Sequence, residues 1–461
     1  MHKILRIFRE ALDGTEKSYT TGSINRAIVL LSIPMILEMA MESLFAVADA
    51  FFVAKISVEA IAAVGLTESV ITLIYSLAIG LSTAASAMVA RRIGEGDPER
   101  AAIAAMQSIY IAVAISILIG IPGIIYAEDV LRWLGGSETL IETCVGYTRI
   151  SFGGNIVIML LFLLNGVFRG AGDAAIAMRS LWIANGINIV LDPLLIFGLG
   201  PIPAMGIEGA AIATFIGRGT GVVYQLYMLR KGSGVIHLAW THLKFQAKIA
   251  WKLAEVASTG ALQFLIASAS WIFLMRIISN FGSEAVAGYT ISIRLLIFTL
   301  MPSWGIANAA STLVGQNLGA GQPDRAEVSV WRAAFYNMVF LAVVSVAYFF
   351  MAEFLIRIFD NTPGVVDAGV LSLRIICAGY LFFAYGMVIS QSFNGAGDTR
   401  TPTVINLICF WLLQIPLGYA LAITAGWGLA GVCWAIAIGE TAAAIFCIVV
   451  FRRGKWKTVE I

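Results

Sequence analysis

Twelve long apolar stretches constrain this sequence more than any other feature. A helix needs about 20 apolar residues to cross ~30 Å of hydrocarbon at ~1.5 Å per residue. Only 13% of the residues are charged, about half the share found in a soluble domain. Because a backbone inside lipid must satisfy its own hydrogen bonds, we predict an all-α membrane protein with twelve transmembrane helices. The expected spans are 27–53, 60–90, 101–126, 140–168, 176–199, 207–229, 250–280, 285–315, 326–351, 367–393, 402–424 and 428–451.

The second half of the chain repeats the first at a separation of 225 residues. Gly80-Leu-Ser-Thr-Ala-Ala-Ser corresponds to Gly305-Ile-Ala-Asn-Ala-Ala-Ser, and Gly170-Ala-Gly-Asp corresponds to Gly395-Ala-Gly-Asp. Six helices per copy is an even number, so both copies enter the membrane in the same direction. We therefore predict two parallel six-helix repeats, an N-lobe and a C-lobe, around a central cleft, as in transporters that alternate access to a central site.

The positive charges predict the orientation. With both termini cytoplasmic, the inner segments hold 22 of the 30 Lys and Arg residues, as the positive-inside rule requires. This orientation fits a multi-pass protein of the inner (cytoplasmic) cell membrane. The short loops predict that a monomer is sufficient. The expected parts are a cytoplasmic N-terminal segment at 1–26, the N-lobe at 27–229, a cytoplasmic linker at 230–249, the C-lobe at 250–451 and a cytoplasmic tail at 452–461.

Other function classes find little support in the sequence. The net charge of +2 gives no reason to expect a nucleic-acid partner. Glycine-rich segments such as Gly94-Glu-Gly-Asp-Pro fit helix–helix turns, whereas a phosphate-binding loop needs GxxxxGK[ST] after a strand. The sequence lacks that motif, so we expect no enzyme and no nucleotide cofactor. Any transport would then run on an ion gradient or on the gradient of the substrate itself.

Charged side chains inside a membrane span are costly, so each one is a functional candidate. One face of the first helix carries Glu38, Glu42 and Asp49. One face of the fifth helix carries Asn185, Asn188 and Asp192. The matching positions of the seventh helix hold Gln263, Ala267 and Leu274, and Glu440 is the one acid deep in a span of the second half. The titratable chemistry therefore belongs mainly to the first half, which suggests an ion site there.

Two prolines support this interpretation. Pro34 and Pro193 lie in or near the same helices and free backbone carbonyls by breaking i→i−4 hydrogen bonds. Carboxylates, amide oxygens and freed carbonyls are hard ligands that suit a small cation. Two of these carboxylates could instead share one proton, because two neighbouring buried charges repel each other strongly.

Simpler interpretations of these residues stay open. Asp49 lies near the outer end of its helix and could reach water, and Asp192 precedes a proline and could serve the kink. Glu38 could face the cleft or pair with a basic residue such as Arg149. Glu68 and Glu440 fit a structural role as well as a functional one. The aromatic residues could contact lipid, pack within the bundle or line the cleft; they are Phe45, Trp271, Tyr380 and Phe383.

Four motifs together resemble the multidrug and toxic compound extrusion (MATE) family. They are Val47-Ala-Asp-Ala-Phe-Phe-Val after Pro34, Asn165-Gly-Val-Phe-Arg-Gly-Ala-Gly-Asp, Asn188-Ile-Val-Leu-Asp-Pro and Gly206-Ile-Glu-Gly-Ala-Ala-Ile-Ala-Thr. The resemblance covers essentially the whole chain. Within the family the chain looks closest to the DinF-like branch, because the NorM-like branch has an acid on helix 7 where this chain has Ala267.

The resemblance implies a site for a coupling ion, H⁺ or Na⁺, and no other cofactor. The implied ion site consists of Asp49, Asn188, Asp192, Thr214 and the carbonyl of Ala210, of which the first four would ligate Na⁺. The expected substrate cavity contains Glu38, Glu42, Phe45, Tyr147, Asn165 and Asn185, and the last three would also extend the hydrogen-bond network of the ion site. Glu42 departs from the family pattern, which often has Gln there, so it could bind a cationic substrate or alter the proton stoichiometry.

We therefore expect a secondary antiporter that exports amphipathic, often cationic, organic compounds in exchange for H⁺ or Na⁺. The ion at Asp49 and Asp192 would shift the first helix and displace substrate from the first-half cavity. One alternative is a lipid or lipid-linked precursor flippase of the same superfamily, although the few arginines within spans disfavour a strongly cationic cavity. The other alternative is an ion channel or a structural membrane scaffold, since channels can also be built from repeats.

Overall fold

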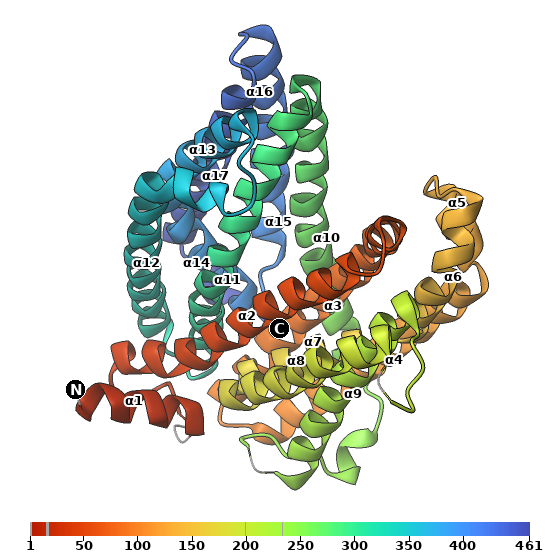
Figure 1. The fold of residues 1–461 in the computed structure, drawn as a ribbon. Helices are drawn as coiled ribbons and strands as arrows, with labels where there is room; N and C mark the ends of the chain where they lie inside the picture. Colours follow the sequence, from red (N-terminus) through yellow and green to blue (C-terminus); the bar gives the residue numbers. More distant parts are fainter. Residues whose placement is uncertain (1, 15–17, 199, 233) are drawn as a thin grey trace. The chain divides into compact units, whose positions relative to one another are not determined.

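The computed structural model describes residues 2–14, 18–198, 200–232 and 234–461, and this part of the chain is almost entirely helical (Figure 1). Residues 1, 15–17, 199 and 233, which the predicted N-terminal segment, fifth span and linker include, lie outside the described residues. No β-strand occurs in the described part. The predicted all-α fold is therefore confirmed.

The helices of the first half follow the predicted spans with small shifts at their ends. They are α2 (Ile24–Ala54), α3 (Val58–Gly94), α4 (Pro98–Ile125), α6 (Glu138–Gly153), α7 (Asn155–Ala171), α8 (Ala174–Phe197) and α9 (Gly206–Lys231). Shorter elements are α1 (His2–Asp13), α5 (Ala127–Trp133) and η1 (Trp240–Leu243).

The second half has the same order of helices. It consists of α10 (Ala247–Ile278), η2 (Ser279–Phe281), α11 (Ser283–Gly319), α12 (Pro323–Arg357), α13 (Pro363–Ala378), α14 (Tyr380–Ala396), α15 (Arg400–Asn406), η3 (Leu407–Gln414), α16 (Ile415–Tyr419), η4 (Ala420–Thr424), α17 (Leu429–Arg452) and η5 (Lys455–Thr458). The segments η3 and η4 are π-helical turns on either side of Pro416, a proline that cannot donate a backbone hydrogen bond.

Two of the twelve predicted spans are broken helices. The span of α6 and α7 bends by 41° at Gly154, and that of α13 and α14 bends by 58° at Gly379. The sequence analysis expected continuous helices at 140–168 and 367–393, and this detail is wrong. Asn155 stabilises the first break, because its side-chain amide donates to the carbonyl of Ser116 at 3.1 Å and also to that of Phe152.

Within the described residues, nine helices and these two bent pairs are long and apolar enough to cross a membrane. The remaining span is α9, whose 26 residues cover ~39 Å at 1.5 Å per residue. It carries Glu208, Arg218, Arg230 and Lys231, which reduce its hydropathy. These helices make up the twelve predicted spans.

The chain divides into two compact units whose boundaries fall inside α2 and α10. The first unit comprises Met1–Ser18 and Leu37–Ala261, and the second comprises Tyr19–Ile36 and Leu262–Ile461. The start of α2 thus belongs to the second unit and the start of α10 to the first. Two glycines at equivalent repeat positions explain this arrangement, because each allows one of these helix segments to pack closely. In the first unit a Cβ on Gly80 would lie 2.4 Å from the Ala257 carbonyl oxygen. In the second unit a Cβ on Gly305 would lie 2.6 Å from the Ile36 nitrogen.

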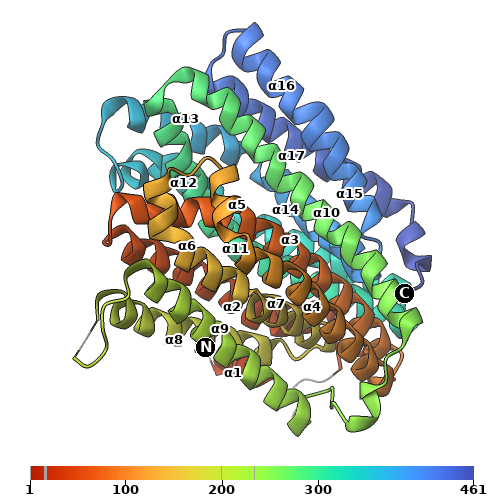
Figure 2. The same ribbon diagram turned by 90° about the vertical axis from the view of Figure 1, so that its right-hand side faces the viewer.

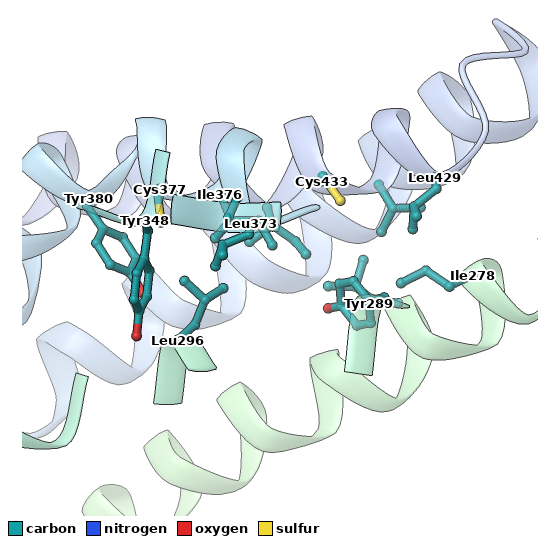
Figure 3. Packing of buried hydrophobic residues seen from close by; sticks show 14 of the residues in the cluster. Ile278, Tyr289, Leu296, Tyr348, Leu373, Ile376, Cys377, Tyr380, Leu429 and Cys433 are labelled. Carbon is teal, nitrogen blue, oxygen red and sulfur yellow. The ribbon is translucent and has the colours of Figure 1, made fainter. Parts of the chain in front are cut away.

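Each unit has its own buried apolar cluster. The cluster of the second unit includes Tyr289, Leu296, Tyr348 and Leu373 (Figure 3). The described cysteines are free and buried, as small packing residues are expected to be, and Cys377 and Cys433 belong to this cluster. The first unit has a smaller cluster around Val53, Leu131, Cys144, Ile196 and Ala210.

The predicted C-terminal tail packs on the second unit. Trp456 of η5 is buried and stacks on Phe451 with ring centroids 4.6 Å apart. Lys457 forms ion pairs with Glu327 at 2.6 Å and with Asp324 at 3.2 Å. The hydrogen bond to Glu327 raises the pKa of Lys457, so the Lys457 ammonium stays charged at neutral pH.

The close approach at Gly80 can be tested by adding one methyl group. Gly80→Ala places a Cβ against backbone atoms of α10 that cannot rotate away, so we expect a destabilisation of about 1–3 kcal/mol. Gly65→Ala in the same helix is the control, because nothing lies within 4 Å of its Cβ. Thermal unfolding in detergent measures both variants, and equal unfolding temperatures would contradict the close packing.

Candidate ion-binding and substrate site

Small residues bring the backbones of α8 and α9 into contact. Gly209, Ala213, Gly217 and Gly221 recur every four residues and form one face of α9. A Cβ on Gly209 would lie 2.5 Å from the Leu195 carbonyl oxygen, so the two backbones touch directly. Helices in membranes pack in this way through small residues, and α8 and α9 lie side by side in both views (Figures 1 and 2).

This packing brings together three predicted members of the ion site. The Asn188 amide nitrogen donates to Asp192 Oδ2 at 3.0 Å, and its oxygen accepts from the Thr214 hydroxyl at 3.2 Å and from the Thr214 N–H at 3.0 Å. The regular acceptor for that N–H in a helix is the carbonyl four residues earlier, that of Ala210. Asn188 therefore competes with the Ala210 carbonyl for its donor, and Asn188 and Asp192 are both fully buried.

The remaining predicted member of the ion site, Asp49, lies half-buried on α2. It is close enough to Arg218, Asp192 and Glu68 for the charges to interact. Neither Asp49 nor Asp192 forms an ion pair in the described part of the chain. Tyr147 is close enough to Asp49 and Glu68 to interact with their charges. It also packs against the apolar cluster of the first unit.

Among the described residues, no group of three or more His, Cys, Asp or Glu side chains is arranged to hold a metal ion. A sodium ion here would need the two aspartates together with neutral oxygens. Asn188 and Thr214 supply such oxygens. The donor set therefore fits either Na⁺ or a proton shared between the carboxyl groups.

The two remaining acids of α2 are paired. Glu38, only 1% exposed, forms an ion pair with Arg169 at 3.2 Å, and Arg169 also donates to Ser82. Glu38 thus pairs with a basic residue, as one of the two expectations had it, but the partner is Arg169 and not the suggested Arg149. Arg149 instead contacts Glu128 of α5 at 2.9 Å. Arg169 lies in the last turn of α7, and its long side chain reaches Glu38 there.

Glu42 is occupied by a cation of the chain itself. Its Oε1 lies 3.0 Å from Arg218 Nη2, and its Oε2 accepts from the Asn185 amide at 3.1 Å. A cationic substrate was one expected partner of Glu42, but in the structure its carboxylate forms an ion pair with Arg218. Arg218 and Asn185 therefore fix the position of the Glu42 carboxylate. The sequence feature that could have indicated the ion pair is Arg218 itself, a lone arginine in the sixth predicted span.

Arg218 is enclosed by aromatic rings. Its guanidinium carbon lies 5.0 Å from the Phe45 centroid, 5.8 Å from that of Phe162 and 5.9 Å from that of Tyr75. Such contacts stabilise a cation through the negative faces of the rings. Arg218 is 1% exposed, and its Nε and Nη1 groups have no hydrogen-bond partner among the described residues. Phe45, a predicted cavity residue, therefore contacts Arg218.

Asn165 belongs to a separate polar contact. Its Oδ1 accepts a hydrogen bond from Gln225 of α9, and both side chains are buried. Neither residue bonds to Asp49, Asn188 or Asp192 in the described part. Gln225 was missed by the sequence analysis, because a single amide in an apolar helix carries no distinctive pattern.

The fold and this site define a class of protein. Two six-helix repeats with buried carboxylates inside one lobe are the architecture of a membrane transporter. Residues 34–194 and 260–420 each match the MatE family, and together they cover well over half of the chain. The chain therefore belongs to the MatE family, which confirms the resemblance found in the sequence, and it is a multi-pass membrane transporter and no enzyme.

Relatives of known name match along most of their length. A protein of Thermotoga maritima named "Probable multidrug resistance protein NorM" is 27% identical over 94% of this chain and 93% of its own. A protein of Shewanella oneidensis named "FAD transporter" is 28% identical over 86% of this chain and 88% of its own. A solved structure of an outward-facing multidrug resistance MATE family transporter is similar with a TM-score of 0.89 and 27% identity, over 94% of this chain and 96% of its own.

The Glu42–Arg218 pair predicts strongly non-additive mutations. Arg218→Met leaves the largely buried Glu42 carboxylate without its cationic partner, which costs about 3–5 kcal/mol. Adding Glu42→Gln removes the stranded charge, so the double variant should recover most of that loss. Thermal unfolding of the two single variants and the double variant measures the coupling.

The matched control is Arg149→Met, which breaks an exposed pair with Glu128 and should cost about 1 kcal/mol or less. Additive losses in the Glu42 and Arg218 variants would show that the two side chains do not interact.

Proposed function

We propose that this protein is a secondary antiporter that exports amphipathic or cationic organic compounds in exchange for H⁺ or Na⁺. The observation that carries the proposal is the contrast between the acids of the first unit. Glu38 and Glu42 form ion pairs with arginines, whereas Asp49 and Asp192 form none in the described part of the chain, although the Asp49 charge interacts with Arg218 as well as with Asp192 beside Asn188 and Thr214. Acids without a basic partner in a membrane are candidates for ion binding.

The repulsion between Asp49 and Asp192 supplies the driving interaction. In surroundings of low dielectric constant two nearby carboxylates are costly to keep charged together, and a proton or a sodium ion relieves that cost. The Asn188 amide nitrogen donates to Asp192 and its amide oxygen accepts two hydrogen bonds from Thr214, so the Asp192 carboxylate has a fixed position. An ion can favour one conformation only by binding it more tightly than the other.

The proposed moving part is α2. Pro34 interrupts the hydrogen-bond ladder of this helix, and the boundary between the two compact units falls just after it, between Ile36 and Leu37. Asp49 lies on the side of that boundary that belongs to the first unit. Ion binding at Asp49 would thus act on a helix that already has a weak point.

The substrate class is argued from charge and from the names of relatives. The multidrug proteins among the relatives support export of organic compounds. The Shewanella protein named for FAD indicates that the relatives of this chain do not all carry the same substrate. A flippase or an anion carrier would need unpaired cations, but Arg169 and Arg218 already pair with Glu38 and Glu42.

We further propose that both termini are cytoplasmic, that the protein acts in the inner (cytoplasmic) membrane, and that a monomer is sufficient. The distribution of Lys and Arg supports the orientation. The assignment to the DinF-like branch stays a prediction, as does the choice between H⁺ and Na⁺.

Gradient-driven transport tests the proposal. Purified protein in sealed liposomes loaded with a fluorescent organic cation receives either an H⁺ gradient or a Na⁺ gradient. We expect one gradient to move the dye in wild type and in the control Asp129→Asn, an exposed residue of α5. Asp49→Asn should lose this movement because one carboxylate of the pair is neutral in every state.

Movement by neither gradient in wild type would exclude export of cationic compounds and make lipid flipping the next hypothesis to test. Ion conductance without dye exchange would support a channel. Unchanged gradient-driven movement in Asp49→Asn would remove this residue from the coupling site.

A further inference from the structure

The N-terminal helix α1 has an apolar side and a charged side. At 100° per residue the apolar residues follow one another over roughly half of the circumference; they are Ile7, Ala11, Phe8, Leu12 and Leu5. The remaining side carries Arg6, Arg9, Glu10 and Asp13. A helix with this pattern covers its apolar side with protein or with lipid.

The protein covers only part of the apolar side. Ala11 is 2% exposed, and Ile7 and Leu12 are half-buried. Leu5 and Phe8 remain 59% and 43% exposed. Residues three, four and seven positions apart lie on one face of a helix, so Leu5, Phe8 and Leu12 form one strip along α1. This apolar strip is the part of the helix that needs a cover.

The end of α1 is attached to the start of α8. Arg179 Nη2 donates to the Leu12 carbonyl oxygen at 2.6 Å, and carbonyls in the last turn of a helix have no donor within the helix itself. A Cβ on Gly14 would lie 3.1 Å from the Ala175 Cβ. The last turn of α1 therefore lies against the first turns of α8 (Figure 1).

This attachment determines the depth of α1 in the membrane. The helix α8 is long and apolar enough to span a bilayer. Its 24 residues cover ~36 Å at 1.5 Å per residue, slightly more than the ~30 Å of hydrocarbon. The first turn of α8 therefore lies where the acyl chains meet the headgroups, and α1 lies at the same level.

The charged side of α1 suits lipid headgroups. The Arg6 and Arg9 side chains are 71% and 86% exposed. Each pairs loosely with an acid one turn later, Glu10 at 3.5 Å and Asp13 at 3.6 Å. Exposed pairs of this kind contribute little, so the guanidinium groups can bind another acceptor. A guanidinium binds a phosphate through two N–H groups.

We propose that α1 is an interfacial anchor that binds the phospholipid surface beside the start of α8. Leu5, Phe8 and Leu12 lie among the upper parts of the acyl chains. Arg6 and Arg9 lie at the level of the phosphates. The anchor holds the start of α8, which carries part of the proposed ion site, at a fixed depth. This inference does not depend on the antiport proposal.

Spin labels on the full-length protein test the proposal in nanodiscs of phosphatidylethanolamine and phosphatidylglycerol. A nitroxide is attached to Leu5→Cys, to Phe8→Cys and to the control Arg6→Cys on the charged side. The native cysteines are buried, and wild type treated in the same way reports any background labelling. We expect the first two labels to collide more with oxygen, which concentrates among acyl chains, than with Ni-EDDA, which stays in water. The control label should show the reverse.

A second measurement adds no label to α1. With 12 residues, α1 is too short for a stable isolated helix in water, so its amide hydrogens are protected only where it is bound. Leu5→Gln combined with Phe8→Gln should raise the sequence-corrected exchange rates of α1 in nanodiscs about tenfold or more. The control Asp13→Asn, which keeps the apolar strip, should exchange no faster than wild type. The unfolding temperature of each variant checks that the spans remain folded.

Three results would overturn the proposal. Labels at Leu5→Cys and Phe8→Cys that collide mainly with Ni-EDDA would show that the apolar strip faces water. Labels reached by neither reagent would show that protein, such as a second copy of the chain, covers the strip. Equal exchange in wild type and in the double variant would show that the strip does not attach α1 to the membrane.

Discussion

The cost of a charge inside a lipid-embedded helix bundle governs how this protein is organised. Each buried charge must find a partner within the protein or serve a purpose that outweighs its cost. Glu38 and Glu42 find partners in Arg169 and Arg218. Asp49 and Asp192 form no ion pair in the described part of the chain, and we propose that they bind the coupling ion. Because Glu38 and Glu42 are paired, Asp49 and Asp192 are the acids of the first unit that we propose for ion binding.

Close backbone packing makes this arrangement possible. Glycines on α9 and α17 bring each helix against its neighbour in the same way in both halves. A duplicated scaffold can then carry different chemistry, because at the separation of 222 residues that relates Gly217 to Gly439, Arg218 corresponds to Glu440. Fold symmetry and charge asymmetry are thus compatible, since the small residues fix the backbone and leave the charged positions free to differ.

The sequence predicted the spans, the repeat and the grouping of Asn188, Asp192 and Thr214, because length, periodicity and family motifs are local signals. It did not predict the breaks at Gly154 and Gly379, since a glycine alone does not specify a bend. The partners of Glu38 and Glu42 were also missed. Long arginine side chains choose among several acids according to helix packing, which no single helix reveals.

The most direct test of the central claim is ion release on substrate binding. Thermodynamic linkage requires that a substrate displaced by an ion must also displace that ion. Tetraphenylphosphonium is added to purified protein in weakly buffered solution, and the released protons, or ²²Na⁺ from sodium-loaded protein, are counted. The account predicts release of one of these ions from wild type and none from Asp192→Asn. Absence of release in wild type, or equal release from the variant, would contradict it.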